Sequence, residues 1–439
     1  MNSKHKASRP PAIILGGAGN ALSIARSLGR AGVEVYAINH PQALVRYSCF
    51  SKWIDLGHSA AEGEEAWAAY LLGRQSDPLR GAVLLAASDE GLELIASHWQ
   101  QLGGKFTLDI SNPEAQFRML NKLSTYLAAQ AAGVPTPKFW IADSRARIGE
   151  LKDELVFPLI VKPLFSHKAQ KFGEKLVRVE SFDELIRAFD FMQAVGIRTF
   201  LVEVIPGLDD KLCSYYTYVD ENGDNLFDFT KRILRRYPLS VGLACYHITD
   251  RVPHIKDLSL RLLRQVGLRG VANLEFKLDE RDGQLKLIEC NARFTAADCL
   301  VADAGVNLSL FVYHRLTGHP QAAPKDFRPG LRLWYPVDDY RAYRQLNRMG
   351  VLSFRSWVRS VLHRQTFPFF RWYDPLPAIV KGARFFAEYL GRHLGSKKLL
   401  PPAGTVGAAR GVSAGARPAG QASIPQDVSN CCAGPSHHD

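Results

Sequence analysis

Apolar and polar residues alternate in two stretches of the chain, residues 271–278 and 284–293. In the first, Leu274 and Phe276 fall on one face of a strand and Glu275 on the other, because strand side chains alternate. Asp282-Gly283 predicts a tight turn between the stretches. Folding about this turn brings Glu275 nearly opposite Glu289. The pattern predicts a β-hairpin whose polar face carries two carboxylates, the amide of Asn291 and the guanidinium of Arg293.

The rest of the pattern predicts an α/β protein. Residues 11–17, 20–31 and 33–39 read as strand, helix and strand, and a further strand covers 81–87. After helices over 112–133, Val134-Pro135-Thr136-Pro137 predicts a rigid connector. Beyond it we expect strands over 157–163 and 199–205, a polar loop over 164–175, a helix over 181–195 and a hairpin over 215–229.

Charge is concentrated in one segment. The 439-residue chain has a formal net charge of +12, of which residues 325–400 hold +10 and residues 1–324 only +2. A basic pI therefore gives no reason to expect a nucleic-acid partner for the main body. With no signal-like segment and no run of about 18 apolar residues, we expect a cytoplasmic protein. Residues 401–439, rich in Ala, Gly, Pro and Ser, predict a disordered tail.

Candidate chemistry lies in four places, each with a plainer alternative. Oxygen ligands from Glu275, Glu289 and Asn291 suit Mg²⁺, although ordinary surface charges on a hairpin edge would look similar. Lys162, the only charge in its strand, suits a phosphate oxygen or reaches solvent. Lys122 alone would normally be a surface lysine. The loop over 166–173 either closes over phosphates or is an ordinary surface loop.

The glycine-rich stretch from Gly16 to Gly19 invites a dinucleotide interpretation. Its spacing is not G-x-G-x-x-G, and the second strand ends at Asn39 without an acid for the ribose. We therefore interpret this stretch as a loop that helps to bind a substrate, in preference to an NAD site.

Taken in order, these segments resemble the ATP-grasp superfamily, and most closely its carboxylate–amine ligase-like members, over roughly residues 10–320. The likeness rests on Ala12 to Gly17, Leu85 to Asp89, Asn121-Lys122 with Gly133 to Pro137, Val161-Lys162-Pro163, Ile205-Pro206-Gly207, Glu275 to Lys277 and Glu289 to Arg293. It implies a Rossmann-like domain over 10–112, an ATP-grasp domain over 113–324 with lobes at about 135–203 and 204–324, and a basic, aromatic helical extension over 325–400.

The resemblance also implies residue roles. Lys122 and Lys162 would contact ATP phosphates, and Arg293 would neutralise the transferred phosphate. Glu203 and Val204 would form the adenine hinge, and Asp209 would contact the ribose. Mg²⁺ would be held by Glu275, Glu289 and Asn291. Ile233 stands where a lysine is expected, so Arg232 and Arg235 are the candidates to replace it.

The resemblance implies an ATP- and Mg²⁺-dependent ligase, with Mn²⁺ as a second possible metal, that activates a carboxylate as an acyl phosphate and joins it to an amine. The alternative is a degraded ATP-binding module, which Ile233 favours. The expected partners are small carboxylates and amines and a second copy in a homodimer. His167 and His247 are candidates to take the amine proton. The amphipathic stretch 376–394 either lies on the inner membrane surface or, as we favour, packs its apolar side on the body.

Overall fold

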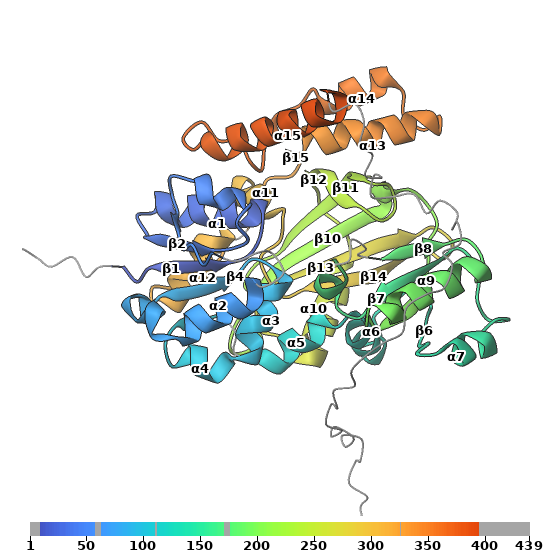
Figure 1. The fold of residues 1–439 in the computed structure, drawn as a ribbon, viewed down its shortest axis with the longest axis horizontal. Coiled ribbons are helices and arrows are strands. Elements are labelled where there is room, and N and C mark those ends of the chain that lie inside the picture. Colours follow the sequence, from blue (N-terminus) through green and yellow to red (C-terminus); the bar gives the residue numbers. More distant parts are fainter. Residues whose placement is uncertain (1–8, 58–62, 110–111, 171–175, 325, 395–439) are drawn as a thin grey trace, which may run out of the picture. The chain divides into compact units, whose positions relative to one another are not determined.

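The computed structural model describes residues 9–57, 63–109, 112–170, 176–324 and 326–394. The predicted disordered tail, and residues 171–175 of the predicted phosphate loop, lie outside these ranges. Within them the α/β prediction is confirmed, with a parallel sheet, two largely antiparallel sheets and helices around them (Figure 1).

The N-terminal domain is built on a parallel sheet with strand order β3-β2-β1-β4-β5. The apolar strands predicted at its start and near residue 83 are β1 and β4, paired side by side at the centre of the sheet. Its elements are β1 (Ala12–Leu15), α1 (Gly19–Arg30), β2 (Val35–Ile38), η1 (Leu44–Tyr47), β3 (Lys52–Trp53), α2 (Gly63–Leu72), η2 (Arg74–Leu79), β4 (Val83–Ala86), α3 (Asp89–Ser97), α4 (Trp99–Gly103) and β5 (Thr107–Leu108).

Two helices, α5 (Pro113–Leu120) and α6 (Lys122–Ala131), lead into a small lobe with sheet order β6-β9-β7-β8. Asn121 ends one helix and caps the next, since its side chain accepts hydrogen bonds from the backbone of Leu123 and Ser124. The lobe comprises β6 (Phe139–Trp140), α7 (Arg145–Glu150), β7 (Leu159–Pro163), α8 (Ser166–Gln170), β8 (Val177–Val179), α9 (Phe182–Ala194) and β9 (Thr199–Glu203). The predicted loop thus begins with a short helix, α8.

The third unit is a seven-stranded sheet of order β14-β13-β10-β11-β12-β15-β16. The predicted hairpin is confirmed as β13 and β14, with Glu275 opposite Glu289 and Asn273 opposite Asn291. The elements up to residue 316 are η3 (Asp209–Lys211), β10 (Leu212–Val219), β11 (Phe229–Tyr237), β12 (Leu243–Thr249), α10 (Ile255–Val266), β13 (Gly270–Asp279), β14 (Gln284–Asn291), α11 (Asp298–Asp303) and α12 (Leu308–Leu316).

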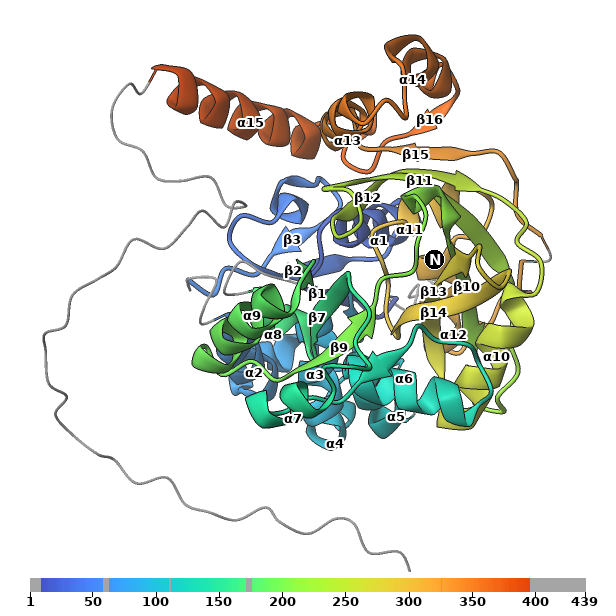
Figure 2. The same ribbon diagram turned by 90° about the vertical axis from the view of Figure 1, so that its right-hand side faces the viewer.

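The segment after residue 325 is not purely helical, because two of its strands continue this sheet beyond β12. Its elements are β15 (Arg332–Trp334), α13 (Pro336–Arg348), α14 (Phe354–Val361), β16 (Gln365–Thr366) and α15 (Leu376–Leu394). Helix α13 contacts β11 and β12, whereas α15 contacts η1 of the N-terminal domain (Figure 2). Among the described residues, no helix is both long and apolar enough to cross a membrane.

Helix α15 packs on the body through a side that we did not expect. Arg384 donates hydrogen bonds to the Gln42 carbonyl oxygen and the Tyr47 hydroxyl. Ile379 and Phe386, on the apolar side, are about 60% exposed. The prediction that the apolar side faces the body is therefore wrong for Leu376, Ile379 and Phe386, which are exposed, whereas Val380 and Leu390 are half-buried. The contacts of Arg384 are with the turn after β2 and with η1.

Candidate functional site

The paired carboxylates of β13 and β14 form the centre of the candidate site. Burial and the neighbouring Glu289 carboxylate raise the pKa of Glu275. Burial alone would raise the pKa of Glu289 as well, but the ammonium groups of Lys122 and Lys162 lower that pKa to about 2. The cations near Glu289 thus outweigh its burial, whereas those near Glu275 do not. A cation between the two would relieve their repulsion.

Both predicted phosphate-binding lysines lie beside this pair. The Lys122 ammonium is 3.4 Å from Glu289 Oε2, and only 3% of Lys122 is exposed. Lys162 is also buried and donates a hydrogen bond to the Ile288 carbonyl oxygen at 2.9 Å. The interpretation of Lys122 as a surface lysine, and of Lys162 as one that reaches solvent, does not hold.

The two buried lysines differ in their electrostatic state. Burial lowers the pKa of Lys162 to about 8. Burial also disfavours charge on Lys122, but the carboxylates of Glu289 and Asp89 outweigh it and raise the pKa of Lys122 above its usual value. Lys122 therefore stays charged at neutral and moderately alkaline pH, whereas Lys162 loses its proton as the pH rises through about 8.

The ligand set fits a hard divalent cation in chemistry. Within the described ranges, no group of three or more His, Cys, Asp or Glu side chains is arranged to hold a metal. The candidate donors are instead two carboxylates and the Asn291 amide, whose nitrogen donates to Glu289 Oε1 at 3.1 Å. The amide oxygen accepts from Arg293 Nη2 at 3.3 Å. Such oxygen-only donors suit Mg²⁺ better than zinc.

Arg293 joins the hairpin to the N-terminal domain. Its Nε lies 2.6 Å from Asp89 Oδ1, at the start of α3. Both side chains are largely buried, and the carboxylate raises the pKa of Arg293 despite its burial. Arg293 is therefore a fixed positive charge at the junction of β14 and the N-terminal domain.

A cavity of about 370 Å³ opens next to Lys162, between the small lobe and the large sheet. Four residues predicted to bind nucleotide, Lys162, Glu203, Val204 and Asp209, are among those that line it. The Ile288 carbonyl that binds Lys162 belongs to an irregularity in the hairpin, where the register shifts between Glu275 and Phe276. The irregularity sets Ile288 against the cavity instead of opposite a β13 residue.

The hinge residues are held by neighbouring elements. The backbone N–H of Glu203 donates to the Lys138 carbonyl oxygen, and its carboxylate forms an ion pair with Arg281. Asp209 accepts a hydrogen bond from the Ser240 N–H at 3.0 Å. These contacts fix the cavity wall where the resemblance implies an adenine hinge and a ribose contact.

Arg232 and Arg235 are not brought to this site. Arg232 lies opposite Cys213 in the sheet register, so it shares the face of Cys213 and not that of Ser214 and Glu275. Its Nε is paired with Asp250 at 2.7 Å. Arg235 is buried in an ion pair with Asp339 of the extension at 2.5 Å. The structure therefore corrects the expectation that these two arginines replace the lysine missing at position 233.

Two other basic residues of the same strand lie near the carboxylate pair and the cavity instead. Lys231 lies opposite Ser214, which lies opposite Glu275, and its ammonium donates to Ser214 Oγ at 3.0 Å. Arg236 lines the cavity of about 370 Å³, called the nucleotide cavity below after its predicted role, 3.7 Å from Asp209. Strand alternation from Glu275 through the hairpin 215–229 could have identified Lys231. The irregular register after Ile233 has no signal in the sequence, so Arg236 could not be found.

The glycine-rich turn packs tightly against its neighbours. A side chain on Gly17 would come within 2.8 Å of the Ala87 carbonyl oxygen, and Gly17 has a φ of +88°. Asn20 Nδ2 donates to the carbonyl oxygens of Ala87 and Phe294. The turn is thereby joined to the ends of β4 and β14.

The two histidines considered as proton acceptors lie in different surroundings. His167 is paired with Glu93 of α3, and burial lowers the pKa of His247 well below its usual value.

Comparison with known proteins sets this geometry in a class. No family model matches the chain. The sequence is 28% identical to a D-aspartate ligase of Enterococcus faecium (strain Aus0004) over 250 residues, covering 54% of this chain and 59% of that relative. The chain thus matches about three fifths of this curated relative.

Two solved structures share the fold. One is the biotin carboxylase domain of Hydrogenobacter thermophilus 2-oxoglutarate carboxylase with MgADP (TM-score 0.57, 15% identity, 73% of each chain). The other is an L-amino acid ligase from Bacillus licheniformis (TM-score 0.53, 18% identity, 73% of this chain and 78% of that one). The chain therefore has the ATP-grasp fold, and its sequence is similar to that of carboxylate–amine ligases such as the D-aspartate ligase.

Proposed function

We propose that this chain is an ATP- and Mg²⁺-dependent ligase that activates a carboxylate as an acyl phosphate and joins it to an amine, releasing ADP and phosphate. The observation that carries the proposal is the half-buried pair Glu275 and Glu289, with the buried Lys122 beside Glu289 and the buried Lys162 at the edge of the cavity. A structural hairpin edge has no need of two facing, half-buried carboxylates and two buried lysines together.

In the first step, a substrate carboxylate oxygen attacks the γ-phosphorus of ATP and the bond to the bridging oxygen of ADP breaks. Lys122 and Lys162 stabilise the negative charge that spreads over the phosphate oxygens. Glu275, Glu289 and Asn291 would hold Mg²⁺, which when bound supplies further positive charge to the phosphates. In the second step, the amine nitrogen attacks the acyl carbon, the bond from that carbon to the phosphate oxygen breaks, and the departing phosphate takes up the proton that the nitrogen loses.

The substrates that we propose are amino acids or molecules with an amino-acid end. A curated relative is named for D-aspartate and a structural neighbour for L-amino acids. The fixed positive charge of Arg293 is suited to a substrate that brings a carboxylate to the site, and Lys231, whose pKa is lowered by burial, lies near the same hairpin.

The first experiment is calorimetry of ATP binding with and without Mg²⁺, on the native chain and on Glu289→Ala. We expect Mg²⁺-dependent binding in the native chain and its loss in the variant. Glu280→Ala is the control, because Glu280 is an exposed carboxylate of the same hairpin. A subsequent screen follows ADP release with pooled amino acids.

The results separate the candidate functions. Metal-dependent binding with ADP release from one pool supports the ligase. Binding without release from any pool supports the degraded ATP-binding module. Equal ATP binding in Glu289→Ala and the native chain would overturn the assignment of the carboxylate pair.

A further inference from the structure

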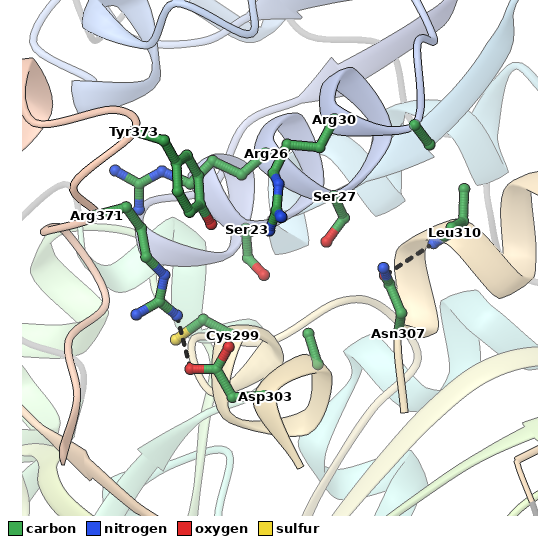
Figure 3. A pocket seen from close by; sticks show the side chains of 12 residues that line it. Ser23, Arg26, Ser27, Arg30, Cys299, Asp303, Asn307, Leu310, Arg371 and Tyr373 are labelled. Carbon is green, nitrogen blue, oxygen red and sulfur yellow. Dashed lines mark hydrogen bonds and ion pairs between the residues drawn. The ribbon is translucent and has the colours of Figure 1, made fainter. Parts of the chain in front are cut away.

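A second cavity, of about 360 Å³, lies beside α1 (Figure 3). Its wall is formed by α1, by α11 and the start of α12, and by the loop that carries Arg371 and Tyr373. None of its lining residues lines the nucleotide cavity. Arg30 lies at the opposite end of α1 from Gly19, about 16 Å along the helix axis. This cavity is therefore not part of the site described above.

Three of the lining side chains are arginines and only Asp303 is acidic. Arg26 is fully engaged, since its Nε pairs with Asp374 at 2.8 Å and its Nη atoms donate to the carbonyl oxygens of Pro368, Phe369 and Asp374. Arg371 pairs with Asp303 at 2.8 Å through one nitrogen. These two charges are balanced by carboxylates.

Arg30 is the exception. In the part of the chain that the structure describes, no carboxylate pairs with it, and its guanidinium carbon lies 4.6 Å from the centre of the Tyr373 ring. That contact holds the side chain over the cavity, and Figure 3 shows the guanidinium directed toward Ser23 and Ser27. The ring thus orients the arginine without neutralising it.

Hydrogen-bond donors converge on the same space. The Ser27 hydroxyl also lines the cavity, and no partner for it is found among the described residues. Arg371 has further N–H groups beyond the one that binds Asp303. A guanidinium with hydroxyl and N–H donors in the same cavity provides the kinds of donor that bind an oxyanion.

We propose that this cavity is a second ligand site, which binds the oxyanion group of a small molecule, a carboxylate or a phosphate, through Arg30, with Ser27 and Arg371 as further donors. The volume is that of a small-metabolite site. A ligand here contacts α1 of the N-terminal domain and the loop of the extension at once. The site does not depend on the ligase reaction and remains open to test if that proposal fails.

The test uses the full-length protein and calorimetric titration with inorganic phosphate and, separately, with succinate. Arg30→Gln removes the unpaired charge, and Ser27→Leu fills the cavity without changing charge. We expect binding to weaken by about tenfold or more in each, since a hydrogen bond to a charged group is lost or blocked. The tighter of the two anions identifies the oxyanion.

Two controls accompany these variants. Arg348→Gln removes an exposed arginine from the last turn of another helix, α13, and should leave the affinity unchanged. Lys162→Gln removes a cation from the nucleotide cavity and should also leave it unchanged. Affinity equal in Arg30→Gln and the native chain, a loss in Lys162→Gln instead, or no binding of either anion would overturn the proposal.

Discussion

The buried ammonium of Lys162 makes ATP affinity a function of pH. Burial places the pKa of Lys162 at about 8 in the protein without nucleotide. Because the pKa is depressed, the folded protein holds this lysine charged below pH 8 and increasingly neutral above it. ATP phosphates favour the charged form, so binding above pH 8 requires uptake of a proton.

The size of the effect follows from that pKa. At pH 7 about nine tenths of the Lys162 side chains are charged, and at pH 9 about one tenth. If only the charged form binds ATP, affinity falls by about tenfold between these values, equivalent to about 1.4 kcal/mol. Lys122 contributes nothing to this change, because its pKa is raised and it stays charged throughout.

Calorimetry of Mg²⁺-ATP binding at several pH values measures the slope. Lys162→Arg should flatten the profile, since arginine remains charged over this range. Lys122→Arg is the matched control and should retain the tenfold fall. A flat profile in the native chain, or an unchanged fall in Lys162→Arg, would refute the reasoning.

Two further predictions concern other parts of the chain. Asp374→Asn should lower the free energy of unfolding by about 3–5 kcal/mol, because Arg26 is left buried without its carboxylate. Urea unfolding measures this change. The control, Asp326→Asn, breaks an exposed ion pair and should lower the free energy of unfolding by less than about 1 kcal/mol. Lys231→Met should reduce the rate of ADP release on the order of a hundredfold. Arg232→Met, on the opposite face of the strand, should keep that rate within about threefold of the native value. Equal effects of the two substitutions would show that the faces of the strand are misassigned.

Local periodicity was sufficient to predict the hairpin. Alternation and one turn dipeptide place Glu275 opposite Glu289, and the structure has that register. The burial of Lys122 is harder to predict, because a single lysine on a helix has no distinguishing sequence pattern. It is buried because the start of α6 packs between β7 and β14, through contacts far apart in the sequence.

Irregular strands and long-range contacts limited the remaining predictions. After Ile233 the register of β11 shifts, and Arg235 turns toward the extension instead of the nucleotide cavity. The contact of Arg26 with Asp374 spans most of the chain. No local pattern could predict that the basic segment would complete the sheet and bind the N-terminal domain.

The strands of the extension have a consequence for solubility. Without β15, β12 would become an edge strand, with backbone N–H and C=O groups open to pairing with another chain. Removing the extension would also leave Arg235 without Asp339. A shortened chain that ends before residue 332 would therefore expose both an unpaired edge strand and an arginine without its carboxylate partner. Aggregation on trimming, and not the release of an independent ligase body, is the behaviour that this sheet dictates.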